Sequence, residues 1–297
     1  MQTFRTKLSQ VETALRDAAI YCGHGYESVS DEAVALVLGA AGLPPEQPLS
    51  LLDQPFPVEA ESQLAALLDQ RCHHRLPVAY CLKEAYLAGL RFIADPRALI
   101  PRSPVSHMVA ERLTPWWPED QEPAVIVDVC CGGGSLGLVA AEAFSKATVL
   151  LSDLDEQALS LASENIALHE RSDRVIALRA DLLSALRSGS IDVMLANPPY
   201  VSRAEMAELP PEYTAEPRIA LEADAEGTEL AVRLLREGAR VLAPNGLMLM
   251  EVGETWTTLE DRLPKVPFLW IELPQGGSGV AIISAQELRD WNAAGIL

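Results

Sequence analysis

The sequence predicts an α/β fold, with a doubly wound parallel sheet in its C-terminal part and a small helical domain before it. From residue 125 onward, short apolar runs typical of buried strands alternate with helical stretches, whereas residues 1 to about 85 show only helical patterns. The chain of 297 residues is also long enough for two domains. We predict a helical domain at 1–84, a hairpin and linker at 85–123, and the sheet domain at 124–297.

The helical domain is predicted from apolar spacing and from capping residues. Its first helix has one apolar stripe, with spacings that alternate between four and three residues, formed by Phe4, Leu8, Val11, Leu15 and Ala18. Ser30 is a candidate N-cap for a second helix that ends before Gly42. A third helix is expected from about Glu59 to Cys72, and residues 85–92 suggest a short hairpin.

Seven short runs are predicted to be the strands of the sheet. A helix from Thr228 to Leu242 and a turn at Pro244-Asn245-Gly246 should precede the fifth of them, and residues 201–227 should form an irregular lid or substrate wall. The runs are Val125–Val129, Thr148–Ser152, Val175–Arg179, Ile191–Ala196, Leu247–Val252, Phe268–Glu272 and Gly279–Ser284.

A glycine-rich turn follows the first strand. Gly132, Gly134 and Gly137 fit the pattern G-x-G-x-x-G, which alone is a weak signal that dinucleotide-binding folds share. Asp128, inside the strand end, would repel a pyrophosphate but attract the cationic amino group of a methionine moiety. The turn therefore favours S-adenosylmethionine as the ligand.

Two further strands end in carboxylates. Asp153 ends the second strand, where it could bind ribose hydroxyls, although this residue alone fits NAD equally well. Asp181, followed by Leu182, ends the third strand, where it could hold an adenine amino group. Each acid could instead cap a helix, but three successive acidic strand ends together favour a ligand site.

The fourth strand ends in Asn197-Pro198-Pro199-Tyr200, which we call the clamp. Proline donates no backbone N–H, so the carbonyl groups here are left as acceptors beside the Asn197 side chain. Tyr200 offers a face for stacking. The clamp suits a flat NH₂ group, although such a sequence can also be a Pro-Pro turn that closes a strand.

Composition limits the other possibilities. The net charge is −19, and no cluster of basic residues lies near the clamp, so direct nucleic-acid binding is not expected. The longest apolar run, residues 33–43, is too short to cross a bilayer, and the five cysteines form no disulfide framework, so we expect a cytoplasmic protein without a membrane partner. Cys72-His73-His74 and Cys81 lack a second ligand pair at zinc-finger spacing, so no metal site is expected.

With these residues identified, the chain resembles the S-adenosylmethionine-dependent protein-glutamine N(5)-methyltransferases. The glycine loop, Asp153, Asp181 and the clamp occur in the family's order, after Leu99-Ile100-Pro101-Arg102. The next residues, Ser103-Pro104-Val105, are similar to the branch that acts on the third protein of the large ribosomal subunit. The branch that acts on release factors usually has an acidic pattern there. The resemblance extends over essentially the whole chain.

The resemblance implies a Rossmann-like, seven-stranded class I methyltransferase sheet, whose last strand runs antiparallel between the fifth and sixth. It implies S-adenosylmethionine as cofactor and a basic ribosomal protein as partner. One departure is that Cys130-Cys131 stands where such families commonly have Gly-Thr. The alternatives are a release-factor methyltransferase, a DNA adenine amine methyltransferase and a non-catalytic chaperone for a ribosomal protein.

The same resemblance implies roles for individual residues. We expect catalysis by Asn197, Pro198 and Tyr200. Substrate binding is expected at Asn197, Pro198, Pro199, Tyr200 and Arg102, with Phe92 as a further wall residue. Cofactor binding is expected at Asp128, Cys130, Cys131, Gly132, Gly133, Gly134, Asp153, Asp181, Leu182 and Asn197.

Overall fold

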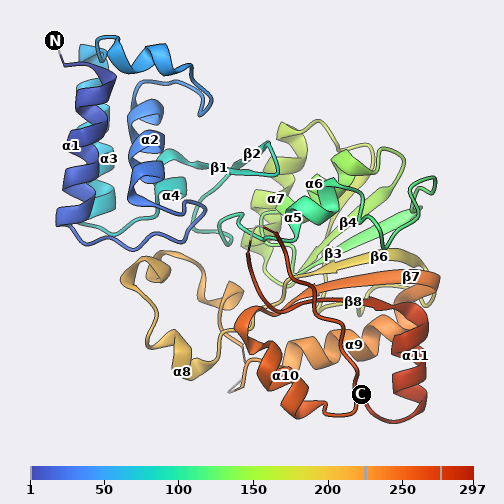
Figure 1. Cartoon of the computed structure of the whole chain (residues 1–297). Helices are drawn as coiled ribbons and strands as arrows, with labels where there is room; N and C mark the ends of the chain where they lie inside the picture. The colour runs from blue at the N-terminus through green and yellow to red at the C-terminus, as the bar shows by residue number, and fades with distance from the viewer. Residues whose placement is uncertain (1, 224–225, 275) are drawn as a thin grey trace. The chain divides into compact units, whose positions relative to one another are not determined.

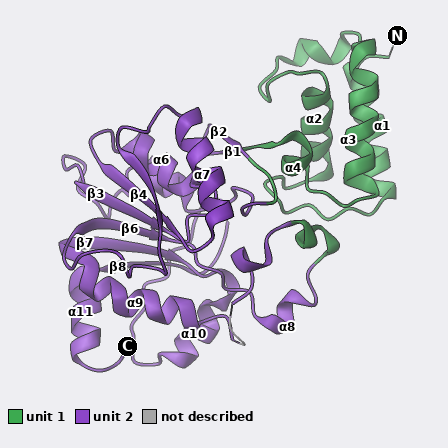
Figure 2. Ribbon diagram, turned by 180° about the vertical axis from the view of Figure 1, so that it is seen from behind, with its two compact units in different colours: residues 1–85, 94–96, 210–215 green, residues 86–93, 97–209, 216–297 purple. Residues whose placement is uncertain are grey.

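The computed structural model describes residues 2–223, 226–274 and 276–297. The chain divides into two compact units (Figure 2). Unit 1 contains residues 1–85, 94–96 and 210–215, and unit 2 contains residues 86–93, 97–209 and 216–297. The short segment 210–215 therefore belongs to the helical unit, although it lies far along the chain within the sequence of the sheet unit.

Unit 1 is built from helices around one hydrophobic core. The helices are α1 (Phe4–Asp17), α2 (Val29–Ala40), α3 (Glu61–Cys72) and α4 (Val78–Leu82), with 3₁₀ turns at Leu49–Asp53, Val58–Ala60 and Pro211–Ala215. The predicted apolar stripe packs inward, since Phe4, Val11 and Leu15 are buried. The predicted N-cap Ser30 is wrong: Ser28 caps α2 by accepting a hydrogen bond from the Asp31 N–H, because Ser28 has the extended backbone that a cap needs.

Unit 2 contains a six-stranded sheet with the order β5-β4-β3-β6-β7-β8 (Figure 1). A separate hairpin, β1 (Glu84–Leu87) and β2 (Leu90–Ile93), matches the predicted one. All neighbours in the large sheet run parallel except β7 and β8, which are antiparallel. The strands are β3 (Val125–Val129), β4 (Thr148–Asp153), β5 (Val175–Arg179), β6 (Ile191–Ala196), β7 (Leu242–Glu251) and β8 (Val280–Ser284).

Helices cover both faces of this sheet, as a doubly wound fold requires. Neighbouring residues of a strand point to opposite faces, so Val193 and Leu195 belong to one core cluster and Met194 and Ala196 to the other. The helices are α5 (Ser106–Ala110), α6 (Ser135–Ala143), α7 (Glu156–Leu168), α8 (Arg203–Met206), α9 (Glu229–Val241), α10 (Trp256–Arg262) and α11 (Ala285–Ala293). A 3₁₀ turn at Arg218–Ala220 and another at Gly253–Thr255 complete the unit.

The expected seven-stranded sheet is wrong in its strand count. Phe268–Glu272 forms no strand; it makes a single antiparallel bridge between Trp270 and Ala281, and Ile271 N–H donates to the Val280 carbonyl. Pro267 and Pro274 flank this segment, and proline cannot donate to a ladder. Consequently β8 lies beside β7 at the end of the sheet and not between two strands.

The predicted turn at Pro244-Asn245-Gly246 also differs from the structure. These residues lie inside β7, which begins at Leu242 directly after α9. The pairing of β6 with β7 shifts register between Ile191 and Val193, opposite this stretch. The turn-forming residues therefore produce an irregularity in the strand and do not interrupt it.

Candidate active site

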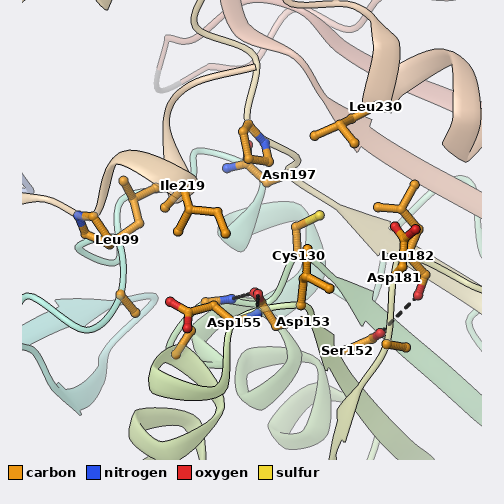
Figure 3. A pocket seen from close by; sticks show the side chains of 18 of the residues that line it. Leu99, Cys130, Ser152, Asp153, Asp155, Asp181, Leu182, Asn197, Ile219 and Leu230 are labelled. Carbon is orange, nitrogen blue, oxygen red and sulfur yellow. Dashed lines mark hydrogen bonds between the residues drawn. The ribbon is translucent and has the colours of Figure 1, made fainter. Parts of the chain in front are cut away.

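An open cavity lies at the carboxyl ends of the parallel strands of unit 2, where open α/β sheets bind their ligands (Figure 3). It collects residues from the loops after β3, β4, β5 and β6. Of the residues expected from the sequence, the cavity is lined by Cys130, Gly132, Asp153, Asp181, Leu182, Asn197 and Pro199.

Asp153 is held firmly at the floor of this cavity. Its Oδ2 accepts a hydrogen bond from the Gly132 N–H at 2.8 Å, and its Oδ1 accepts one from the Asp155 N–H at 2.9 Å. Burial raises the pKa of Asp153 and these N–H donors lower it, with a net increase above the ordinary value. Asp155, not Asp153, caps α7. A carboxylate can accept about four hydrogen bonds, so Asp153 keeps capacity for a ligand.

Asp181 also lines the cavity and is paired with an arginine. The Arg233 guanidinium donates to both carboxylate oxygens of Asp181 at 3.0 Å. The neighbouring Leu182 has a left-handed backbone with φ of 49°, and its carbonyl accepts a hydrogen bond from Ser152 Oγ at 3.1 Å. This hydrogen bond ties the end of β5 to the end of β4 (Figure 3).

Asp128 does not line the cavity. It is 2% exposed, and its Oδ2 accepts a hydrogen bond at 2.8 Å from the Gly137 N–H in α6. Its pKa is raised from the ordinary value of 3.8 to about 7, because burial and the nearby Asp153 raise it by more than the Gly137 N–H lowers it. Asp128 therefore lies behind the glycine loop and supports it.

The glycine loop itself turns through three left-handed residues. Cys130, Gly132 and Gly134 have φ values of 59°, 52° and 79°, so Cys130 adopts a conformation that favours glycine. Its side chain enters the cavity. Cys131 and Gly133 contribute through the backbone: Cys131 N–H donates to the Ser152 carbonyl at 3.1 Å, and the Gly133 carbonyl accepts from Asn165 Nδ2 at 2.9 Å.

The clamp follows β6 directly. Asn197 lines the cavity, while Pro198 is buried and does not line it. The Tyr200 carbonyl accepts a hydrogen bond from Thr255 Oγ1 at 2.9 Å. The Tyr200 ring lies against Gly253, where an added Cβ would come within 2.7 Å of the ring. Gly253 is therefore required for the position of the ring.

Two buried glutamates near the clamp were not among the expected site residues. Glu216 is bound by both arms of Arg102, at 2.5 and 2.8 Å, and also accepts the Ile100 N–H at 3.1 Å. Glu251, the last residue of β7, accepts a hydrogen bond from Ser103 Oγ at 2.5 Å, and the nearby Asn197 side chain lowers its pKa. An acid at the end of a buried strand was the signal that could have identified Glu251.

Arg102 and Phe92 have structural environments of their own. The Arg102 guanidinium donates to Glu216, and neither Arg102 nor Phe92 lines the cavity. Phe92 is fully buried and packs against His169, with ring centroids 5.1 Å apart.

Within the residues that the structure describes, no helix is long and apolar enough to cross a membrane.

The chain is similar over nearly its whole length to proteins named ribosomal protein uL3 glutamine methyltransferase. One from Francisella tularensis subsp. tularensis is 35% identical over 275 residues, which cover 93% of this chain and 88% of the relative. Another from Bordetella pertussis is 34% identical over 289 residues, which cover 97% of each chain. This chain belongs to the uL3 glutamine methyltransferase family. The family expected from the motifs is therefore confirmed.

Two further comparisons agree with a methyltransferase fold. Residues 108–210 match the methyltransferase small domain family. The crystal structure of the hMettl16 catalytic domain superposes with a TM-score of 0.52 and 14% identity, covering 76% of this chain and 81% of that chain. The expected α/β class is thus confirmed for unit 2.

Proposed function

We propose that this chain transfers a methyl group from S-adenosylmethionine to the side-chain amide nitrogen of a glutamine in ribosomal protein uL3, giving N(5)-methylglutamine. Both relatives described above are named for this activity. The observation that carries the proposal is that Asn197 of the clamp lines the same cavity as Asp153 and Cys130. A site for an amide group and a site for a cofactor therefore share one space.

The residues of the cavity fit S-adenosylmethionine. Asp153 offers carboxylate oxygens for ribose hydroxyls, and Gly132 lets the backbone face the ligand, since an added Cβ there would meet only Ala98 at 3.8 Å. Leucine and isoleucine side chains from several loops supply apolar surface for a base. Asp181 is the candidate partner for the adenine amino group, with Arg233 beside it. When bound, the cofactor supplies an electrophilic methyl group on a cationic sulfur.

The clamp addresses the weak point of the reaction, the poor nucleophilicity of an amide nitrogen. The nitrogen lone pair is delocalised into the carbonyl group, and it becomes available only as the nitrogen turns pyramidal. Acceptors at Asn197 and Pro198 would hold the two N–H bonds and favour that geometry, an interaction stronger in the transition state than in the ground state. Positioning can contribute on the order of 7–11 kcal/mol, and the product loses its proton afterwards without a strong base.

Charge favours a basic protein over nucleic acid as the substrate. The net charge of −19 would raise the association rate of a basic partner, and it opposes binding to phosphates. We propose that free uL3 is met in the cytoplasm before ribosome assembly, when its basic surface is uncovered. We assign recognition of the substrate to the helical unit, because it carries no catalytic motif of its own.

A parallel methylation assay tests the proposal. Native enzyme with radiolabelled S-adenosylmethionine is incubated with free uL3, release factors, DNA and assembled ribosomes. We expect a methyl group on a uL3 glutamine by mass spectrometry, with free uL3 preferred to ribosomes. Charged residues at the rim of an interface act mainly on the association rate. Raising the salt concentration should therefore slow the binding of uL3 and leave the rate at saturating uL3 nearly unchanged.

The clamp is tested by Asn197→Ala in the same assay. The saturated rate should fall by at least about a hundredfold, the scale seen when a preorganised polar partner of a transition state is removed. Calorimetry should show that the variant still binds the cofactor. Near-native turnover would refute the clamp mechanism, and methylation of the release factor alone would refute the substrate. Binding of NAD without S-adenosylmethionine would refute the cofactor, and no transfer at all by native enzyme would favour a chaperone.

A further inference from the structure

The catalytic Asn197 has a buried neighbour on the adjacent strand. In the pairing of β6 with β7, Ala196 is opposite Met250, so the next residues, Asn197 and Glu251, emerge side by side at the carboxyl ends of the two strands. Glu251 is 6% exposed and is also paired with Val280 of β8. It is therefore fixed in the sheet and cannot follow the movements of a loop.

Three groups converge on the Glu251 side chain. Ser103 Oγ donates to Oε2 at 2.5 Å, and the Asn197 side chain and Arg102 both lie close enough to lower the pKa of Glu251. Burial raises the pKa of Glu251, and Ser103, Arg102 and Asn197 each lower it, with a net increase above the ordinary value. Arg102 is itself oriented by its two hydrogen bonds to Glu216.

A carboxylate can only accept hydrogen bonds, so an Asn197 amide that binds Glu251 must do so through its NH₂ group. The other end of the amide, the carbonyl oxygen Oδ1, is then turned away from Glu251 and left for the ligand. A reversed amide would place its acceptor against the carboxylate and its donors towards an incoming NH₂ group. The orientation of Asn197 therefore decides whether the clamp can accept from a glutamine amide.

We propose that Glu251 is a positioning residue that fixes the Asn197 amide with its oxygen towards the substrate, and that Ser103 in turn fixes Glu251. The inference rests on the proposed function, in which Asn197 holds the target glutamine. The residues that follow β7 also support the rest of the clamp: Gly253 packs against the Tyr200 ring, and Thr255 Oγ1 donates a hydrogen bond to the Tyr200 carbonyl. Ser103 follows Arg102 in the segment that resembles the uL3 branch, so the support uses a residue of that segment.

A double-mutant cycle on the single-turnover rate tests this role. Glu251→Ala should lower the rate of methyl transfer about 10- to 100-fold, since a misplaced reacting group costs about that much. In the Asn197→Ala background, Glu251→Ala should cause no further loss, because nothing is left to position. Glu251→Gln keeps the shape and an acceptor oxygen, so it should recover most of the rate, to within about tenfold of native. Binding of the cofactor by calorimetry should remain within about twofold of native.

Ser103→Ala provides a second variant should Glu251→Ala fail to fold. It removes one hydroxyl from a half-buried site and should lower the rate about three- to tenfold, again only when Asn197 is present. Ser278→Ala is the matched control, because Ser278 Oγ also donates to a glutamate, Glu254, at 2.5 Å, but this pair is exposed and no hydrogen bond joins it to Asn197. The control should keep the native rate.

The outcomes separate this inference from the proposed function. Equal losses from Glu251→Ala with and without Asn197, or no loss in either, would overturn the positioning role while native enzyme still methylates uL3. Equal damage from Glu251→Gln and Glu251→Ala would overturn it too, since it would indicate a role for the charge itself. If native enzyme methylates none of the substrates, the proposed function has failed instead.

Discussion

The buried acids of the helical unit and the acids beside the glycine loop of unit 2 have different hydrogen-bond donors. In the helical unit, Arg71 is fully buried and binds Glu32 through two nitrogens, at 2.7 and 2.9 Å, and Glu212 at 3.3 Å. Arg75 adds a second contact to Glu212 at 3.2 Å. In unit 2, by contrast, Asp128 and Asp153 accept hydrogen bonds from backbone N–H groups.

The pKa values follow this difference. Burial raises the pKa of Glu212, but the Tyr21 N–H and Arg71 lower it by more, so the net pKa is below its ordinary value. Burial dominates at Asp128 and Asp153, and their pKa values are raised. Arginines therefore neutralise Glu32 and Glu212, whereas a cationic ligand beside Asp153 would lower its raised pKa and favour the charged carboxylate. This suits a cofactor with a positively charged sulfur.

The two regions should respond to pH with opposite signs. A carboxyl whose pKa is lowered on folding stabilises the protein above its unfolded pKa, and this contribution is lost as the pH falls through the folded value. A carboxyl whose pKa is raised stabilises the folded state at low pH, and this contribution is lost as the pH rises through the folded value. Protonation of Glu212 should therefore lower the stability of the helical unit in acid. Ionisation of Asp128 should lower the stability of unit 2 as the pH rises towards neutral.

Arg71→Met is expected to have the largest effect on stability. Removing one partner of a buried pair leaves an uncompensated charge, here chiefly on Glu32 because Glu212 keeps its contact with Arg75, and such losses cost about 3–5 kcal/mol. Denaturant unfolding, with hydrogen exchange in α3 as a local probe, measures the change. The control is Arg5→Met, because Arg5 and Asp53 form an exposed pair at 2.9 Å that should contribute no more than about 1 kcal/mol. Similar losses of unfolding free energy in the two variants would contradict a special role for the buried ion pairs of the helical unit.

Asp128→Asn should produce a smaller effect with the opposite dependence on pH. Asparagine keeps an acceptor for the Gly137 N–H but does not ionise. As the pH rises from about 4 to about 7, the native protein should lose stability relative to the variant. We expect the difference to grow by on the order of 3 kcal/mol over this window. Unfolding curves at several pH values measure it, and parallel pH profiles for native and variant protein would contradict the raised pKa.

The sequence predicted those parts of the fold that depend on local pattern. The strands β3, β5 and β6 match their predicted ranges, because each is a short apolar run bounded by turn residues. It could not show that residues 210–215 belong to the helical unit, since that follows from Glu212 and its ion pairs with Arg71 and Arg75, far away in the chain. Residues 268–272 likewise form no strand because they pair with β8 through a single bridge, and the sequence alone does not show this.

The candidate site was predicted where residues follow strand ends, and missed where partners come from elsewhere. Asp153 and Asn197 line the cavity as expected. Asp128 carries the same type of side chain at a strand end, but it points to α6, and the sequence alone does not give that direction. Glu251 was missed because its role depends on two neighbours: the register of the sheet places Asn197 beside it, and Ser103 reaches it from the segment before α5.

Cys130→Gly should have the smallest effect on stability. It tests whether the residues that line the cavity in unit 2 include one with a strained backbone that lowers the stability of the fold. Cys130 has φ of 59°, and a left-handed residue with a Cβ costs about 1–2 kcal/mol, which glycine would relieve. Glycine also loses about 0.5–1 kcal/mol through the greater freedom of the unfolded chain. We therefore expect a net gain in stability of up to about 1 kcal/mol by thermal or denaturant unfolding. Cys130→Ala removes the thiol but keeps the strain, so it should not share this gain. If alanine stabilises the protein as much as glycine does, then the thiol and not the backbone is the source of the cost at this position.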